Sequence, residues 1–232
     1  MKFRPQFWPT LLSVPMLIIL LALGTWQANR YTWKADLIEK LNTRSEAEAI
    51  DLSAVLGAPD DMEFRRVRVT GTYLHDREIH LIARSMRGNP GIHVLTPLRR
   101  ADGKGTELIN RGWVPPERSK PTARAGGQIE GEVTVEGIVR LAKGQGRFIP
   151  DNDAAKNVWF FIDPVAMAAA ARVDSLPSHY IVSAVEDVEG DFPVGKQWRI
   201  DLPNNHFEYA LTWYLLAVSL VAVYVVYHRK RD

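Results

Sequence analysis

Two long apolar runs without a charged residue, one near each end of the chain, constrain the fold more than any other feature. The first extends from Trp8 to Trp26 and the second from Tyr209 to Tyr227, and each is nineteen residues long. At about 1.5 Å per residue, a helix of that length crosses the roughly 30 Å hydrocarbon core of a bilayer. Aromatic residues at both edges of each run suit the boundary between lipid and water. The sequence therefore predicts two transmembrane helices, residues 8–26 and 206–227.

Each run has an alternative interpretation. Lys2 and Arg4 precede the first run, as in a cleaved signal peptide, although the apolar region of such a peptide is usually about 7–15 residues long. The second run is also compatible with a buried core helix of a soluble protein, but residues 229–231 close it with the positive flank of a stop-transfer segment. We favour a membrane anchor for both runs.

The positive charges at the chain ends predict the orientation. By the positive-inside rule, the tails 1–7 and 228–232 lie in the cytoplasm and the segment between the helices lies outside it, in the periplasm. Too few residues precede the first run for an amphipathic transit peptide, which favours a bacterial inner membrane. The net charge of +2 comes from these ends, which argues against a nucleic-acid-binding protein. We therefore expect the lipid bilayer, and no nucleic acid, as a partner.

Composition and motifs exclude several enzyme classes. The chain has no cysteine, so it forms no disulfide, thiolate metal site or iron–sulfur cluster and has no cysteine nucleophile. The serine-hydrolase and zinc-peptidase motifs are also absent from the sequence. The segment between the helices is therefore interpreted as a recognition module and not as an enzyme.

That segment changes character at residue 57. Residues 27–56 are charged and helix-like and predict a stalk, whereas residues 57–205 predict a β-rich, α+β periplasmic domain. Its expected strands are 65–74, 78–84, 91–99, 106–114, 132–140, 157–163 and 179–185. A hairpin turn is expected at 100–105, and a helix at 164–173 with Asp163 as its cap and Pro164 in its first turn. A small antiparallel barrel or curved sheet fits this pattern.

Histidines near strand ends suggest one alternative function. His75, His80 and His93, with Met62 and Met86, supply the imidazole and thioether groups that copper prefers, as in a periplasmic copper-delivery protein. Their spacing matches no metal-site template, and copper carriers usually have richer clusters of cysteine or methionine. Packed or surface histidines are the simpler interpretation.

The least ordinary residues lie at the membrane boundary. Helical spacing places Trp26, Arg30 and Trp33 on one face beyond the first span, and His206, Tyr209 and Trp213 on one face of the second, where Asn204 or Asn205 can cap the helix. An imidazole can ligate haem iron, aromatic rings can flank a macrocycle, and Arg30 could pair with haem propionates. The same residues also suit interfacial anchors and caps.

At these residues the sequence resembles the Surfeit locus protein 1 family of cytochrome c oxidase assembly factors, over nearly the whole chain. The matching motifs are Leu23–Gln27 with Arg30 and Trp33–Lys34, then Gly91–Leu98 and Leu108–Pro115, then Pro203–Tyr214. The resemblance implies an assembly factor, not an enzyme, that binds haem a and promotes its insertion into subunit I of the oxidase. It also implies that His206 binds the haem iron, and that haem A synthase and other assembly factors are possible partners.

The remaining site residues come from helix geometry. Trp26, Arg30, Tyr209 and Trp213 are expected to contact the haem beside His206. Gly91, Gly112 and Trp113 are expected to determine the fold, because a side chain would crowd the glycines and Trp113 suits a core. Two mechanisms stay open: transfer of haem a held at His206, and a scaffold that stabilises an assembly intermediate without holding haem.

Overall fold

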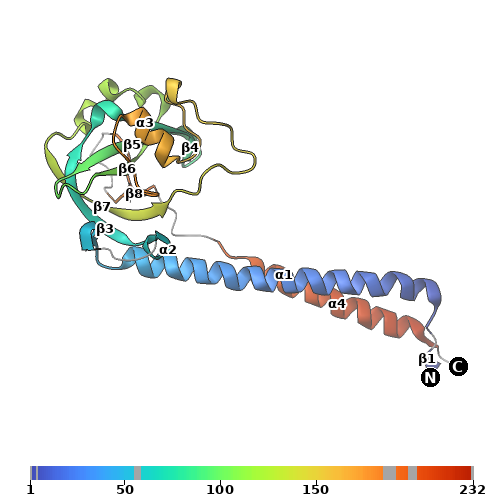
Figure 1. Cartoon of the computed structure of the whole chain (residues 1–232). Helices are drawn as coiled ribbons and strands as arrows, with labels where there is room; N and C mark the ends of the chain where they lie inside the picture. The colour runs from blue at the N-terminus through green and yellow to red at the C-terminus, as the bar shows by residue number, and fades with distance from the viewer. Residues whose placement is uncertain (1, 4, 55–58, 185–191, 198–202, 231–232) are drawn as a thin grey trace. The chain divides into compact units, whose positions relative to one another are not determined.

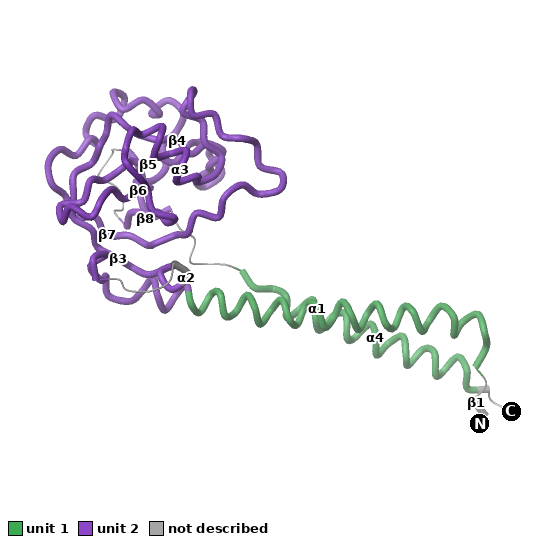
Figure 2. Tube along the Cα trace, viewed as in Figure 1, with its two compact units in different colours: residues 1–40, 200–232 green, residues 41–199 purple. Residues whose placement is uncertain are grey.

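The computed structural model describes the 232-residue chain except for residues 1, 4, 55–58, 185–191, 198–202 and 231–232 (Figure 1). The chain divides into two compact units, residues 1–40 with 200–232, and residues 41–199 (Figure 2). Each unit has its own internal contacts. We therefore describe them separately.

The first unit is an antiparallel pair of helices formed by α1 (Phe7–Glu46), up to residue 40, and α4 (His206–His228). Near one end the Thr10 hydroxyl lies 2.6 Å from the hydroxyl of Tyr224, and the short strands β1 (Lys2–Phe3) and β9 (Arg229–Lys230) pair beside it. Both helices are long and apolar enough to cross a membrane, and only 11% of either apolar window is buried. Apolar helices with so much exposed surface are compatible with the predicted spans and unlike the core helix of a soluble protein.

The second unit contains a seven-stranded mixed sheet. Its strands are β2 (Ile50–Asp51), β3 (Arg66–Tyr73), β4 (Ile79–Met86), β5 (Asn89–Arg100), β6 (Thr106–Val114), β7 (Glu132–Leu141) and β8 (His179–Ser183). They lie in the order β2-β3-β7-β8-β6-β5-β4, and β3 also pairs with β5. The pairings thus return from β5 to β3, as a small barrel requires. The barrel shape itself stays a prediction.

Two apolar clusters and two short helices complete this unit. One cluster joins β3, β7 and β8 through Val69, Val139 and Ile181. The other packs Met167 of α3 (Pro164–Ala171) against residues of β4, β5 and β6. As predicted, Asp163 caps α3 by accepting a hydrogen bond from the amide of Ala166, and Pro164 is in the first turn. The other helical segments are α2 (Pro59–Met62) and 3₁₀ turns at Leu52–Ala54, His75–Arg77, Pro116–Arg118, Pro121–Gly127 and Ala154–Lys156.

Most predicted strands are confirmed, but the sheet is not purely antiparallel, because β2 pairs parallel to β3 and β6 pairs parallel to β8. The predicted helical stalk is also too long, since α1 ends at Glu46 and Ile50–Asp51 forms β2. There the Asp51 carboxylate accepts a hydrogen bond from the amide of Ser53, a local turn that competes with helix. Residues 55–56 of the stalk and residue 185 of the last predicted strand lie outside the described residues.

The predicted strand 157–163 is wrong. Asn157 has a left-handed backbone, and Trp159 joins β4 only through an isolated bridge to Leu81. The side-chain oxygen of Asn152 accepts the backbone N–H of Phe160 at 2.8 Å, where a neighbouring strand would otherwise pair. Of the aromatic residues that suggested a strand, Trp159 is buried in the second cluster.

Candidate functional site

The candidate site surrounds His206, the first residue of α4, within the helix pair. Its Nδ1 lies 2.7 Å from the side-chain oxygen of Gln27 on α1. Because an amide oxygen only accepts hydrogen bonds, this contact places the proton of a neutral imidazole on Nδ1 and the lone pair on Nε2. Among the described residues, nothing hydrogen-bonds to Nε2. The imidazole is therefore in the tautomer that can bind a metal through Nε2.

The chain that leads into α4 is fastened to the next turn of α1. The Asn204 amide donates to the carbonyl of Tyr31 at 3.1 Å, and Lys34 donates to the carbonyl of Pro203. The rings of Tyr31 and Phe207 pack with centroids 5.8 Å apart. These contacts fix the start of α4 against α1.

The predicted cap of α4 is only partly right. Asn205 occupies the cap position, but its side chain makes no capping hydrogen bond. Asn204, the other candidate, directs its amide to α1 instead. Asn204 thus connects the start of α4 to α1, and Asn205 is the residue before the helix. Neither side chain accepts a hydrogen bond from the first amides of α4.

Small residues bring the two helices close together. A Cβ placed on Gly24 would lie 2.8 Å from the ring of Tyr214, and Ala210 and Ala217 of α4 are buried. The Thr25 hydroxyl lies 3.2 Å from the Tyr214 hydroxyl. Small residues at such positions are typical of packed membrane helices.

The other predicted site residues lie on the same two helices as His206 and Gln27. Trp26 and Tyr209 are each 57% exposed, and Trp213 is half-buried. Arg30 is stacked on Trp33, with its guanidinium carbon 4.0 Å from the ring centroid. In the described part of the chain, no hydrogen bond, ion pair or ring contact joins these side chains to His206. The structure thus brings His206 to Gln27, a pairing that the helical spacing of either helix alone did not indicate.

The second unit contains a buried ionic cluster that no sequence pattern predicted. Arg124 donates to both carboxylate oxygens of Glu78, and Arg111 Nη1 lies 4.0 Å from the same carboxylate. Arg111 also donates to the carbonyl of Gly127 and lies over the ring of Tyr73, 4.9 Å from its centroid. Burial is the main reason that the pKa of Tyr73 rises to about 12. We interpret this cluster as structural, because its hydrogen-bond donors and acceptors are bonded to groups of the same unit.

Two of the three histidines considered for copper contact this cluster. His75 Nε2 donates to the carbonyl of Ile129 at 2.8 Å, and its Nδ1 faces Arg111 Nη1 at 3.4 Å. Burial is the main cause of the lowered pKa of His75. His80 Nε2 lies 3.9 Å from the Glu78 carboxylate.

The third histidine lies on β5. Asn110 of β6 donates to His93 Nδ1 at 3.1 Å, and burial, followed by the charge of Arg84, lowers the pKa of His93 to about 4. Across the described residues, no three His, Asp or Glu side chains are grouped so that they could hold a metal ion. The copper alternative therefore has no cluster of histidine and carboxylate ligands to support it there.

The structure confirms the fold-determining residues of the central motif. A Cβ on Gly91 would lie 2.3 Å from Nε1 of the buried Trp113. Gly112 has a φ of +130°, and a Cβ there would lie 2.0 Å from the carbonyl oxygen of Val194. Both positions require glycine for close approach, and Gly112 also for its backbone conformation.

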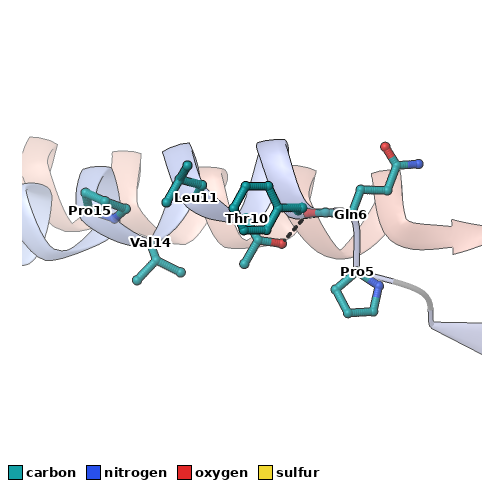
Figure 3. Close-up of a pocket in the computed structure, with 7 residues that line it drawn as sticks. Pro5, Gln6, Thr10, Leu11, Val14 and Pro15 are labelled. Carbon is teal, nitrogen blue, oxygen red and sulfur yellow. Dashed lines mark hydrogen bonds between the residues drawn. The ribbon is translucent and has the colours of Figure 1, made fainter.

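An open hollow lies at the other end of the helix pair, but it lacks site chemistry. Figure 3 shows its lining, which comes from the first turns of α1 and the residues just before them: Pro5, Gln6, Phe7, Thr10, Leu11, Val14 and Pro15. The Thr10 hydroxyl donates to the carbonyl of Gln6 within that turn. This lining contains no charged residue and no histidine. It is a surface irregularity of an apolar helix.

Comparisons with known proteins agree with the resemblance found in the motifs. The SURF1 family model matches residues 14–218. A SURF1-like protein of Monosiga brevicollis is 37% identical over 97% of this chain and 88% of that protein. Surfeit locus protein 1 is 34% identical in both Takifugu rubripes and Homo sapiens, over 85% and 90% of this chain and 87% and 73% of those proteins. The chain therefore belongs to the SURF1 family.

Proposed function

We propose that this chain is an assembly factor for a haem-copper terminal oxidase, which binds haem a through His206 and promotes its insertion into subunit I of cytochrome c oxidase. The proposal makes it a carrier and not an enzyme. Its place is a bacterial inner membrane, with both termini in the cytoplasm and the sheet unit in the periplasm. Haem A synthase and other assembly factors are its further proposed partners.

One observation carries the binding proposal: the hydrogen bond from His206 Nδ1 to Gln27, which leaves the lone pair of Nε2 for iron. The fit is supported by the surroundings. Trp26 and Tyr209 expose apolar rings that could contact a macrocycle, and the Arg30 guanidinium could pair with propionates. Family membership supports the assembly role.

The test is a visible absorption spectrum of the full-length protein, purified in detergent after co-expression with a haem A biosynthesis pathway. We expect a haem a Soret band in the wild type and a shifted band, or one several-fold weaker, in His206→Ala. His80→Ala, which removes an imidazole from the sheet unit, serves as the control and should match the wild type.

The remaining outcomes distinguish the two mechanisms. Purification of the wild type without haem would move the function to a scaffold that stabilises an assembly intermediate. Equal haem content and identical spectra in the wild type and His206→Ala would show that another residue binds the iron.

A further inference from the structure

We propose that Gln27 is the positioning residue of His206: it accepts the Nδ1 proton and so holds the imidazole with Nε2 directed outward as the iron ligand. The inference rests on the proposed function of His206 as that ligand. It adds to the site a residue on the other helix, which has no contact with the haem in this proposal. The site is then a two-helix structure, since neither helix alone supplies both ligand and acceptor.

The first step of the argument is the tautomer. A neutral imidazole carries one proton, and free histidine side chains favour it on Nε2. The 2.7 Å contact to an oxygen that only accepts places it on Nδ1 instead. Without that acceptor the ring has no described partner that selects either nitrogen. Gln27 therefore decides which nitrogen has the lone pair.

The second step is the rigidity of the acceptor. A glutamine side chain has three torsions, so a useful acceptor must have its backbone held in place. Gln27 lies between Gly24, which packs against Tyr214, and Tyr31, which binds Asn204 and contacts Phe207. These contacts lie about one turn before and one turn after Gln27 on α1. They fix the distance between the two helices at the height of the hydrogen bond.

The third step is the chemistry of the acceptor. Histidine ligands usually donate their second N–H to a carbonyl or carboxylate, which orients the ring and increases its basicity as a ligand. Loss of such an acceptor typically lowers metal affinity about 10- to 100-fold. A carboxylate accepts more strongly than an amide, so glutamate at this position should donate more charge to the iron through the imidazole.

The experiment compares Gln27→Leu and Gln27→Glu with the wild type as full-length proteins in detergent. Asn29→Leu, which removes an exposed amide two residues away, is the matched control. We expect Gln27→Leu to raise the dissociation constant for haem a about 10- to 100-fold, and Gln27→Glu to keep the affinity while lowering the midpoint potential of the bound haem. Asn29→Leu should leave both quantities unchanged. Far-UV circular dichroism checks that each variant keeps its helices.

A second measurement does not depend on haem. Nitrogen-15 NMR of histidine-labelled, haem-free protein reports which ring nitrogen of His206 is protonated, with His206→Ala used for assignment. We expect Nδ1 to be protonated in the wild type and in Gln27→Glu, and the proton to move largely to Nε2 in Gln27→Leu. A wild-type proton on Nε2, or Gln27→Leu with unchanged affinity and potential, would overturn the inference.

The two proposals fail separately. If the wild type binds no haem, or His206→Ala binds it as well as the wild type, the function proposed for His206 is wrong. The proposed effect of Gln27 on the bound iron is then wrong as well. The NMR result still decides whether Gln27 sets the tautomer. If His206→Ala abolishes binding while both Gln27 variants behave as the wild type, only the inference about Gln27 is overturned.

Discussion

Arg124 and Glu78 form a two-pronged ion pair in which Nη1 lies 3.1 Å from Oε1 and Nη2 donates to Oε2. The side chain of Glu78 is 4% exposed and that of Arg124 is 0% exposed. Burial alone would raise the pKa of Glu78, but the contact with His80 and the hydrogen bonds and charge of Arg124 outweigh it and lower the pKa. The pair stays ionised in the interior because each partner neutralises the other.

Removal of one partner of this pair should therefore destabilise the sheet unit strongly. Arg124→Met leaves a buried carboxylate without its main partner, and breaking such a pair typically costs about 3–5 kcal/mol. Urea denaturation of the detergent-solubilised chain, followed by tryptophan fluorescence, should show the lower midpoint. Lys156→Met, which breaks the exposed pair with Asp153, is the control and should leave the midpoint unchanged. Equal midpoints for the two variants would contradict a structural role of the Arg124–Glu78 pair.

Gly112 should not tolerate alanine. Its φ of +130° disfavours any side chain, and the new Cβ would collide with the carbonyl of Val194. Strain and overpacking each typically cost about 1–3 kcal/mol. Gly103→Ala is the matched control, because Gly103 also has a positive φ but open space around it. The same denaturation experiment should show the larger loss for Gly112→Ala, and equal losses would mean that the approach of Val194 does not matter.

His93 should make the sheet unit less stable in acid. Its folded pKa of about 4 lies below the unfolded value of about 6.5, so below pH 6.5 the unfolded chain takes up a proton that the folded chain does not. Stability is therefore complete above pH 6.5 and falls as the pH approaches 4, by up to about 3 kcal/mol. His93→Gln, which keeps an acceptor for Asn110, should show a shallower fall between pH 7 and pH 4.5. Identical pH profiles would mean that His93 is protonated as easily in the folded protein.

The close contact at Gly24 should be required for helix pairing. Gly24→Val would push a branched side chain into the ring of Tyr214 and separate the helices, whereas Ala22→Val makes a similar change on an exposed face. Because the chain has no cysteine, Tyr31→Cys with Phe207→Cys gives a clean pair for a short bis-maleimide. We expect cross-linking to fall several-fold with Gly24→Val and to persist with Ala22→Val. Efficient cross-linking in both would show that the contact between α1 and α4 accepts a larger residue at position 24.

The proposed orientation can be tested with single cysteines. Phe148 is 89% exposed in the sheet unit, and Arg229 follows α4. In spheroplasts of a bacterial host, an impermeant maleimide should label Phe148→Cys directly and Arg229→Cys only after the membrane is opened. The opposite labelling pattern would reverse the orientation.

Sequence patterns located the elements whose signals are local. Residues 106–114 were predicted as a strand and form β6 residue for residue, because the apolar strand residues and the turn at 100–105 lie in one stretch of chain. The prediction was wrong where partners outside the segment decide its structure. Ile50–Asp51 becomes a strand by pairing with β3, and the Asn152 side chain replaces a strand partner for Phe160. Neither partner can be recognised from the segment itself.

At the candidate site, too, the local features were predicted and the partner from another part of the chain was not. Helical spacing correctly placed His206 at the start of the second helix, but the spacing of one helix does not say which of its faces meets another helix. A usable signal was present: Gly24, Gln27, Tyr31 and Lys34 repeat at intervals of three, four and three residues, and the first is small enough for close packing. That stripe, adjacent to the predicted face of Trp26, Arg30 and Trp33, contacts α4 and the residues that lead into it.

The two halves of the His206 site are separated by 179 residues of sequence. A ribosome adds about 5–20 residues per second, so His206 is synthesised roughly 10–35 s after Gln27, its hydrogen-bond partner. The whole sheet unit is made in that interval. A nascent or truncated chain that stops anywhere within it lacks His206, so under the proposed function only a chain that has reached α4 can hold haem.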